Sequence, residues 1–153
     1  MKSRHPNRPR NGKGAPPVKE ASLLTSNQWL FLLVLLALPA AAFWKLALAI
    51  DWRVLMIPLV PAQLFAYTSI WRDKRRAIKG EWRLPESMLH TFELLGGWPA
   101  GFLAQRQFRH KTSKRRYQAT FWLIVATYQY TAVDFLLNWW IARTIAEKVT
   151  ALF

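Results

Sequence analysis

Between Trp29 and Trp44 the chain runs for sixteen consecutive residues without a charge. Only Lys45 interrupts the apolar sequence before it continues to Ile50. A transmembrane helix needs about 20 consecutive, predominantly apolar residues. This stretch reaches that length if the Lys45 ammonium extends along its aliphatic chain to the membrane surface. The sequence therefore predicts a first membrane-spanning helix over about 27–50.

Charged and apolar residues are segregated along the rest of the chain as well. Hydrophobic residues make up 52% of the 153 residues, while Lys and Arg number 22 against 8 acidic residues. Separate apolar and basic blocks are typical of a multi-pass membrane protein, whereas a soluble protein intersperses the two. The chain has no cysteine, which excludes disulfides, thiolate catalysis and zinc–thiolate sites.

Two further apolar stretches favour membrane-spanning helices, at about 54–71 and 119–141. Pro58 and Pro61 should bend the second helix near its outer end. The remaining residues, 142–153, have apolar side chains at helical spacing and form an amphipathic tail suited to the membrane surface. The predicted fold is thus an all-α membrane protein with three transmembrane helices.

The basic residues predict the orientation of these helices. Residues 1–26 are rich in Lys, Arg, Pro and Gly, which predicts a disordered tail followed by a retained signal anchor. Two more basic blocks occupy residues 72–83 and 106–116. Because cytoplasmic loops of membrane proteins carry an excess of Lys and Arg, all three blocks should be cytoplasmic. We therefore expect a bacterial inner (cytoplasmic) membrane protein with a cytoplasmic N-terminus.

The segment 84–105 lies between two basic blocks, so it should enter and leave the membrane on the same face. Its first half has the features of a helix start at Leu84-Pro85-Glu86. A structural turn should follow at Gly96, Gly97, Trp98 and Pro99. The sequence therefore predicts a re-entrant or interfacial helical hairpin at the cytoplasmic face. A fourth full span is the alternative.

One polar stripe within this hairpin is a candidate site for chemistry. At 100° per residue, Glu86, His90 and Glu93 share one face of the first helix. Two acids and a histidine at this spacing could hold a metal ion or share a proton. The competing interpretation is a polar stripe that faces headgroups, water or the neighbouring Lys and Arg. We expect no catalytic triad, resident metal or cofactor elsewhere, because the sequence has no motif for one.

The basic blocks favour phosphate binding. Polybasic segments beside membrane helices are attracted to anionic lipids by about 1 kcal/mol per charge. The same residues could neutralise the phosphates of nucleic acid, a less favoured interpretation. The expected headgroup-binding or phosphate-binding residues are Arg72, Lys74, Arg75, Arg106, Arg109, His110, Lys111 and Lys114.

Asp134 is an ionisable residue inside the last predicted span. At 1.5 Å per residue it lies about 22 Å along that helix, at a depth similar to that of Lys45. We therefore expect an intramembrane ion pair between Asp134 and Lys45, or between Asp134 and Arg53, which holds the helices together. Gln63 and Tyr67 on the second span should add hydrogen bonds between helices.

Several consecutive motifs resemble a family of small bacterial membrane proteins called domain of unknown function 1294. The motifs are Asp73-Lys74-Arg75-Arg76-Ala77, Trp82-Arg83-Leu84-Pro85-Glu86, Leu94-Leu95-Gly96-Gly97-Trp98-Pro99-Ala100, Gln105-Arg106 and Arg109-His110-Lys111-Thr112, followed by Tyr117 and Phe121. The resemblance covers roughly 55–130. It implies no activity, since none is established for the family. Some members carry a cold-shock domain, which this chain lacks, so the resemblance adds nothing in favour of nucleic-acid binding.

Together these observations predict a non-enzymatic membrane module. It should bind anionic lipid headgroups, or a partner membrane protein or second copy of itself, through the basic hairpin. The alternatives are a membrane-embedded enzyme acting on a lipid-like substrate with the Glu/His stripe, and membrane-tethered nucleic-acid binding.

Overall fold

The computed structural model describes residues 24–82 and 84–150, and these residues form helices joined by short turns. The predicted basic tail therefore lies almost entirely outside the described residues. In chain order the elements are α1 (Ser26–Ala47), α2 (Trp52–Lys79), α3 (Glu86–Phe92), the kinked segment η1 (Glu93–Gly97), α4 (Trp98–Gln107), α5 (Arg115–Leu136) and α6 (Trp140–Thr150). The all-helical fold is confirmed for the described part of the chain.

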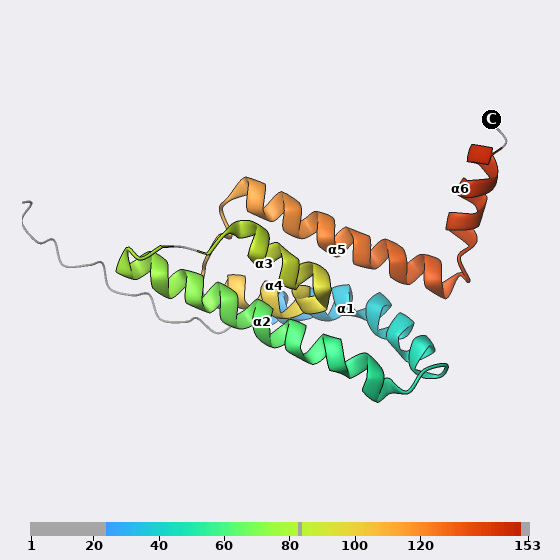
Figure 1. Cartoon of the computed structure of the whole chain (residues 1–153), viewed down its shortest axis with the longest axis horizontal. Helices are drawn as coiled ribbons and strands as arrows, with labels where there is room; N and C mark the ends of the chain where they lie inside the picture. Colours follow the sequence, from blue (N-terminus) through green and yellow to red (C-terminus); the bar gives the residue numbers. More distant parts are fainter. Residues whose placement is uncertain (1–23, 83, 151–153) are drawn as a thin grey trace, which may run out of the picture.

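Three long helices run along the length of the molecule (Figure 1). α1 and α5 run in the same direction and pack on each other, while α2 runs in the opposite direction. The basic C-terminal end of α2 and the N-terminus of α5 therefore lie at one end of the molecule. The turn between α1 and α2 lies at the other end, as does α6.

The helices α3 and α4 form a hairpin whose tip is η1. Both ends of the hairpin lie at the basic end of the molecule, and its tip points toward the middle of the long helices (Figure 1). The tip and α4 pack mainly on α2. One buried cluster joins α1, α4 and α5 through Leu32, Trp98, Phe102, Phe121, Ile124 and Val125. The hairpin thus supplies much of the core of the helical bundle.

Two helices, α1 and α2, are long and apolar enough to cross a membrane. α5 does not belong to this group, so the third span stays a prediction. α2 also extends well past the predicted end at residue 71. At 1.5 Å per residue, its 28 residues cover about 42 Å, more than the hydrocarbon core of about 30 Å. The excess forms the basic end, and α2 ends at Gly80 with a φ of 71°.

The helix that would carry the last predicted span, about 119–141, ends before Ile141. α5 ends at Leu136, because Asn138 and Trp139 adopt φ values of 56° and 61°. Left-handed backbone of this kind ends a right-handed helix. Asn tolerates the conformation, but Trp139 gives no sequence signal for it. The chain turns there and continues as α6, so the amphipathic helix begins at Trp140 rather than at residue 142.

The expected ion pair between Asp134 and Lys45 is not formed. The Asp134 carboxylate is buried and accepts hydrogen bonds from the backbone amides of Ile141 and Ala142 at 2.9 and 3.3 Å. The Lys45 ammonium donates to the carbonyl oxygens of Phe135 and Leu136 and to Asn138 Oδ1, at 3.0, 3.2 and 2.7 Å. The first amides of α6 therefore bind the Asp134 carboxylate, and the last carbonyls of α5 bind the Lys45 ammonium, so the two side chains do not pair with each other.

Arg53, the other expected partner of Asp134, lies at the start of α2 and forms no ion pair within the described residues.

Candidate functional site

The predicted turn at Gly96–Pro99 is where the hairpin reverses. Gly96 has a φ of 107°, a conformation that L side chains rarely adopt. Gly97 lies so close to α2 that an added Cβ would be 2.5 Å from the carbonyl oxygen of Ala62. Ala62 lies midway along the apolar part of α2. The tip of the hairpin therefore reaches about the middle of the predicted span.

Side chains from α2 and α5 bind the backbone groups that the turn leaves without helical partners. Gln63 Nε2 donates to the carbonyl oxygen of Gly96 at 2.7 Å, and Gln63 Oε1 accepts from the amide of Ala100 at 3.0 Å. The Tyr128 hydroxyl donates to the carbonyl oxygen of Leu94 at 2.7 Å. Non-helical backbone at membrane depth is tolerated only where protein or water satisfies it. These bonds meet that requirement.

A buried carboxylate lies between the two arms of the hairpin. Glu93 is fully buried, and its Oε1 accepts hydrogen bonds from Tyr117 Oη at 2.8 Å and from Gln105 Nε2 at 3.1 Å. Its Oε2 shares a hydrogen bond of 2.7 Å with His90 Nδ1. Burial raises the pKa of Glu93, and the hydrogen bonds from Tyr117 and His90 offset only part of that effect. Glu93 therefore joins α3, α4 and α5 in one hydrogen-bonded cluster.

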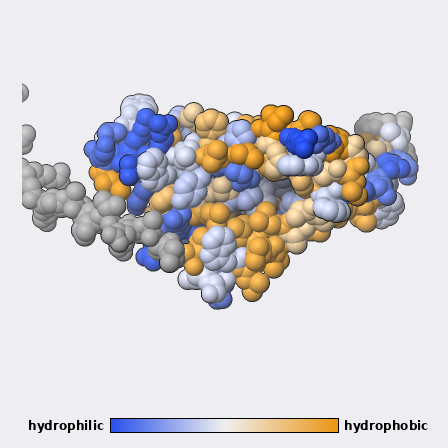
Figure 2. Space-filling model, turned by 90° about the horizontal axis from the view of Figure 1, so that it is seen from below, coloured by the Kyte–Doolittle hydropathy of each residue, from blue (hydrophilic) through white to orange (hydrophobic). Residues whose placement is uncertain are grey.

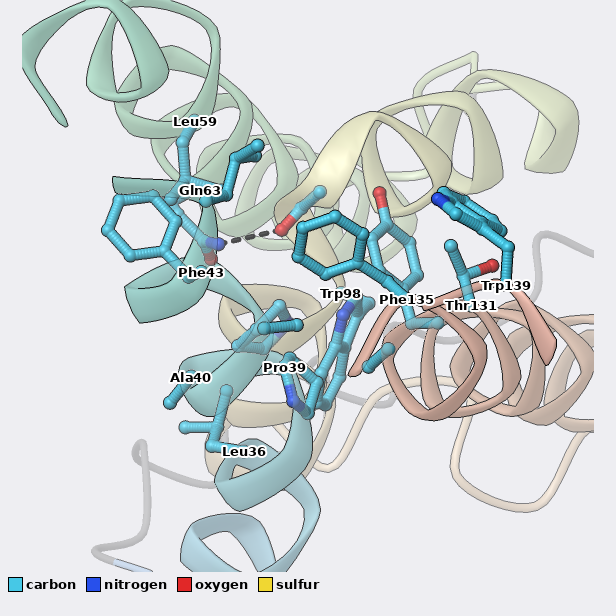
Figure 3. A pocket seen from close by; sticks show the side chains of 16 residues that line it. Leu36, Pro39, Ala40, Phe43, Leu59, Gln63, Trp98, Thr131, Phe135 and Trp139 are labelled. Atoms are coloured by element: carbon cyan, nitrogen blue, oxygen red, sulfur yellow. Dashed lines mark hydrogen bonds between the residues drawn. The ribbon is translucent and has the colours of Figure 1, made fainter. Parts of the chain in front are cut away.

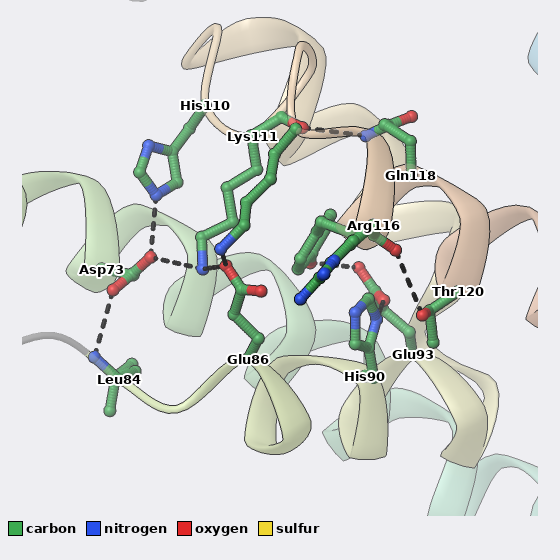
Figure 4. Close-up of polar contacts among 12 residues, drawn as sticks. Asp73, Leu84, Glu86, His90, Glu93, His110, Lys111, Arg116, Gln118 and Thr120 are labelled. Carbon is green, nitrogen blue, oxygen red and sulfur yellow. Dashed lines mark hydrogen bonds and ion pairs between the residues drawn. The ribbon is translucent and has the colours of Figure 1, made fainter.

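A second network joins α2 to the loop before α5 and to the start of α3 (Figure 4). Asp73, which is fully buried, accepts from the amide of Leu84 at 3.1 Å and contacts His110 Nε2 at 2.8 Å. Lys111 Nζ lies 3.1 Å from Asp73 Oδ2 and 3.1 Å from Glu86 Oε1. Lys114 adds a contact to Glu86 at 2.7 Å. This network fixes the hairpin against the basic end of α2.

Three groups in this network have shifted pKa values. The pKa of Asp73 is lowered, because burial, which would raise it, is outweighed by the hydrogen bonds from His110 and Lys111. Burial lowers the pKa of His110, and the hydrogen bond with Asp73 only partly offsets this. The pKa of Glu86 is lowered instead, because burial, which would raise it, is outweighed by the hydrogen bonds from Lys114 and Lys111. At neutral pH the network therefore contains a neutral imidazole and an ionised Glu86.

The three residues of the predicted Glu/His stripe do not form one site. Glu86 is bound by lysines, whereas His90 and Glu93 are bound to each other (Figure 4). Within residues 24–82 and 84–150, no group of three or more His, Asp or Glu side chains is placed to hold a metal ion. The His90–Glu93 pair, packed on the Tyr117 ring with centroids 4.3 Å apart, has the geometry of an internal structural cluster.

The predicted phosphate-binding residues divide into two groups. His110, Lys111 and Lys114 bind the carboxylates of Asp73 and Glu86; among these residues only Asp73 is fully buried, and Lys114 is exposed. The others form no ion pair with the carboxylates that the structure describes; they are Arg72, Lys74, Arg75, Arg106 and Arg109. Figure 2 shows hydrophilic side chains gathered at this end of the molecule and hydrophobic ones over its middle.

An amphipathic groove of about 200 Å³ lies between α2 and α3 at this end. Arg72 and Arg76 line it on the side toward the basic end, and neither forms an ion pair with a described carboxylate. Phe65, Met88 and Phe92 line it on the side toward the middle of the bundle, where the centres of the stacked Phe65 and Phe92 rings are 5.4 Å apart.

Arg76 was not among the predicted site residues. Its spacing of four residues from Arg72 places both on one face of α2 and could have indicated it.

A family described as "Protein of unknown function (DUF1294)" matches residues 63–117, a narrower range than the 55–130 expected from the motifs. No curated protein and no solved structure matches the chain. The matched residues contain the basic end of α2, the whole hairpin and the His110–Lys111 loop. The predicted resemblance to the DUF1294 family, whose function is unknown, is thus confirmed over the residues that form the hairpin region.

Proposed function

We propose that the chain is a multi-pass protein of the bacterial inner membrane with its basic end in the cytoplasm. In this arrangement α1, α2 and α5 span the bilayer, and the α3–α4 hairpin is re-entrant from the cytoplasmic face. Two observations support it. The two basic blocks that the structure describes, 72–82 and 106–116, lie at the same end of the long helices, as the positive-inside rule requires. The turn of the hairpin has its backbone groups bound by Gln63 and Tyr128, as membrane depth requires.

Within this arrangement, the protein acts as a non-enzymatic module that binds the headgroup of an anionic lipid in the groove between α2 and α3. The groove carries this proposal. Its two arginines have no carboxylate partner among the described residues, and they lie toward the basic end. Its aromatic side lies toward the middle of the bilayer. A lipid of the cytoplasmic leaflet has the same polarity, with phosphate at the surface and hydrocarbon below it.

Native mass spectrometry of the full chain in detergent tests this proposal. The wild-type protein should retain phosphatidylglycerol in preference to phosphatidylcholine. Two cations at the membrane surface contribute about 2 kcal/mol, or roughly thirtyfold in affinity. The double variant Arg72→Gln/Arg76→Gln should lose this preference.

The matched control is Arg53→Gln/Arg143→Gln, which removes the same charge at the opposite end of the molecule. It should keep the preference for phosphatidylglycerol. Equal losses in both double variants would show that only net charge matters, and the groove would then not be a headgroup site. A wild-type protein without any preference would refute the proposal outright.

Binding of a partner membrane protein at the same end is the second candidate. It is favoured by the exposed Trp82, which is 88% accessible beside the groove-forming residue Leu84. An exposed Trp of this kind is a common anchor in protein interfaces. A stoichiometric second protein, released on Trp82→Ala but retained by the arginine variants, would favour this candidate over lipid binding.

A further inference from the structure

An apolar cavity of about 630 Å³ lies between the outer halves of α1, α2 and α5 (Figure 3). Its walls include Phe43 from α1, Leu59 from α2 and Phe135 from α5. Trp98 and Pro99 of the hairpin turn form its inner end. The cavity is separate from the α2–α3 groove, with which it shares no lining residue.

The cavity follows from the length of the hairpin. At the basic end, α3 and α4 fill the space among the three long helices. The hairpin turns at Gly96, opposite the middle of α2, and supplies no side chains beyond that level. α1 and α2 touch little there, because α1 packs mainly on α5 and α2 packs mainly on the hairpin. Three helices therefore surround a space that no fourth element fills within residues 24–82 and 84–150.

The chemistry of the lining selects an apolar occupant. Two of the polar side chains in the lining already have partners, since Gln63 binds Gly96 and Ala100, and the Tyr128 hydroxyl binds Leu94. Among the described residues, no buried side-chain polar atom lacks a hydrogen bond. Water needs two to four polar partners in a cavity, and apolar cavities of this kind stay dry. An empty cavity would leave its lining atoms without dispersion contacts.

We propose that this cavity binds one hydrocarbon chain of a membrane lipid, taken from the outer leaflet. Its volume falls within the range of about 300–1,000 Å³ that is usual for small-molecule sites. Its lining comes from three helices and the hairpin turn and is almost entirely apolar, which suits a flexible hydrocarbon chain.

The rim of the cavity suits the headgroup that such a chain would carry. The Lys45 ammonium lies 5.1 Å from the centre of the Phe135 ring, which lines the cavity. It is bound by neutral oxygens at the end of α5 and forms no ion pair with a described carboxylate. A lipid phosphate at the outer surface would meet this cation. The inference depends on the membrane location proposed above, but not on the headgroup groove.

Photolabelling in a lipid bilayer tests the inference. The full chain is placed in nanodiscs that contain a trace of phosphatidylglycerol with a diazirine at the end of one acyl chain. After illumination, labelled residues are identified by mass spectrometry. Trp98 is only 2% exposed and should be labelled through the cavity. Leu95, which is 62% exposed on the same hairpin, reports labelling by bulk lipid. The ratio of label on Trp98 to label on Leu95 is the measured quantity.

Two adjacent alanines provide a matched pair of variants. Ala42 lines the cavity, whereas Ala41 is exposed and does not. Ala42→Phe should lower the ratio severalfold, and Ala41→Phe should leave it unchanged. A second pair on α5, Thr131→Phe inside the cavity and Thr127→Phe outside it, gives the same comparison if Ala42→Phe does not fold.

Either of two results would overturn the inference. Label on Leu95 without label on Trp98 would mean that no acyl chain enters the cavity. Label on Trp98 that persists in both filled variants would mean that the chain reaches this residue by another route. Neither result bears on the preference for phosphatidylglycerol at Arg72 and Arg76, so the two proposals fail separately.

Discussion

The side-chain amide of Gln63 spans the turn of the hairpin, donating to the carbonyl oxygen of Gly96 and accepting from the amide of Ala100. Both backbone groups lose their helical partners because the chain reverses between them. In a protein interior, an unpaired backbone group costs about as much as a lost hydrogen bond. A single residue on α2 therefore makes the reversal possible at this depth.

Gln63→Leu should strongly destabilise the protein. The substitution leaves two backbone groups without partners, at a cost of about 1–3 kcal/mol for each. Thermal unfolding in detergent should show a large drop in melting temperature. Thr68→Val on the same helix is the control, because the Thr68 hydroxyl is exposed and binds only the carbonyl oxygens of its own helix. Equal melting temperatures for the two variants would mean that water or lipid satisfies the turn instead.

Gly97→Ala should prevent the hairpin from docking on α2. The new Cβ would lie 2.5 Å from the carbonyl oxygen of Ala62 and 2.6 Å from the Cβ of Ala66, and backbone cannot move aside as a flexible side chain can. Gly80→Ala is the comparison, because a Cβ added at Gly80 would have no atom within 4 Å. Only the left-handed backbone of Gly80, with a φ of +71°, disfavours a side chain there, at a cost of about 1–2 kcal/mol. Size-exclusion profiles and melting curves should therefore show the greater loss for Gly97→Ala. The reverse order would contradict the close packing of the turn on α2.

His110 should make stability depend on pH in mildly acidic solution. Burial lowers the pKa of His110 below its usual value of about 6.5, so the unfolded chain takes up a proton at a higher pH than the folded protein does. Stability therefore falls as the pH drops below about 6.5 and stops falling once folded His110 is also protonated. Asp73, Lys111 and Lys74 are the charged groups that act on this imidazole.

His110→Gln should flatten this part of the pH profile, because the amide keeps a donor for Asp73 and does not titrate. The measurement is the melting temperature in detergent between pH 7.5 and pH 5. Arg115→Gln, an exposed change outside the network, should keep the wild-type slope. A slope that survives in His110→Gln would assign the pH dependence to another group.

The helices and the turn could be predicted from the sequence because their signals are local. Uncharged runs of sufficient length indicate α1 and α2, and Gly96-Gly97-Trp98-Pro99 ends one helix and starts another. Polar residues on apolar helices also indicated contacts between helices. Gln63 forms such contacts with the hairpin turn, and the Tyr67 hydroxyl donates to Gln107 Oε1 at 2.7 Å.

The partners of the charged residues could not be predicted in the same way. Helical periodicity placed Glu86, His90 and Glu93 on one face, but the lysines that bind Glu86 come from a loop 25 to 28 residues later. That loop brings them back through left-handed backbone at Arg109 and Lys111, for which neither residue type has a preference. Similarly, the sequence predicted an ion pair between Asp134 and a basic residue at a similar depth. In the structure Asp134 binds the first amides of α6 instead, and that helix end exists only because the chain leaves α5 at Asn138.

Asp134→Ala should release α6 from the end of α5. The carboxylate accepts from the first amides of α6, and loss of such an N-terminal cap costs about 1 kcal/mol. Hydrogen exchange at Ile141 and Ala142 should become faster, while the core of α5 near Phe121 stays protected. Thr144→Val, which removes only a hydroxyl bound to its own helix, is the control. Unchanged exchange at Ile141 would mean that the membrane surface, rather than Asp134, holds α6.

The side of the membrane on which the two ends of the hairpin lie can be measured directly, since the chain has no cysteine of its own. Single cysteines at Ser87 and Ser113 flank the hairpin, and a third at Ala49 lies in the turn between α1 and α2; all three positions are exposed. In intact spheroplasts, a membrane-impermeant maleimide should label position 49 and leave positions 87 and 113 unlabelled until the membrane is permeabilised. A hairpin that crosses the bilayer completely would instead place positions 87 and 113 on opposite sides. Label at only one of these two positions would therefore show a fourth span in place of the re-entrant hairpin. The proposals for the headgroup groove and the acyl-chain cavity would then both lose the membrane arrangement on which they depend.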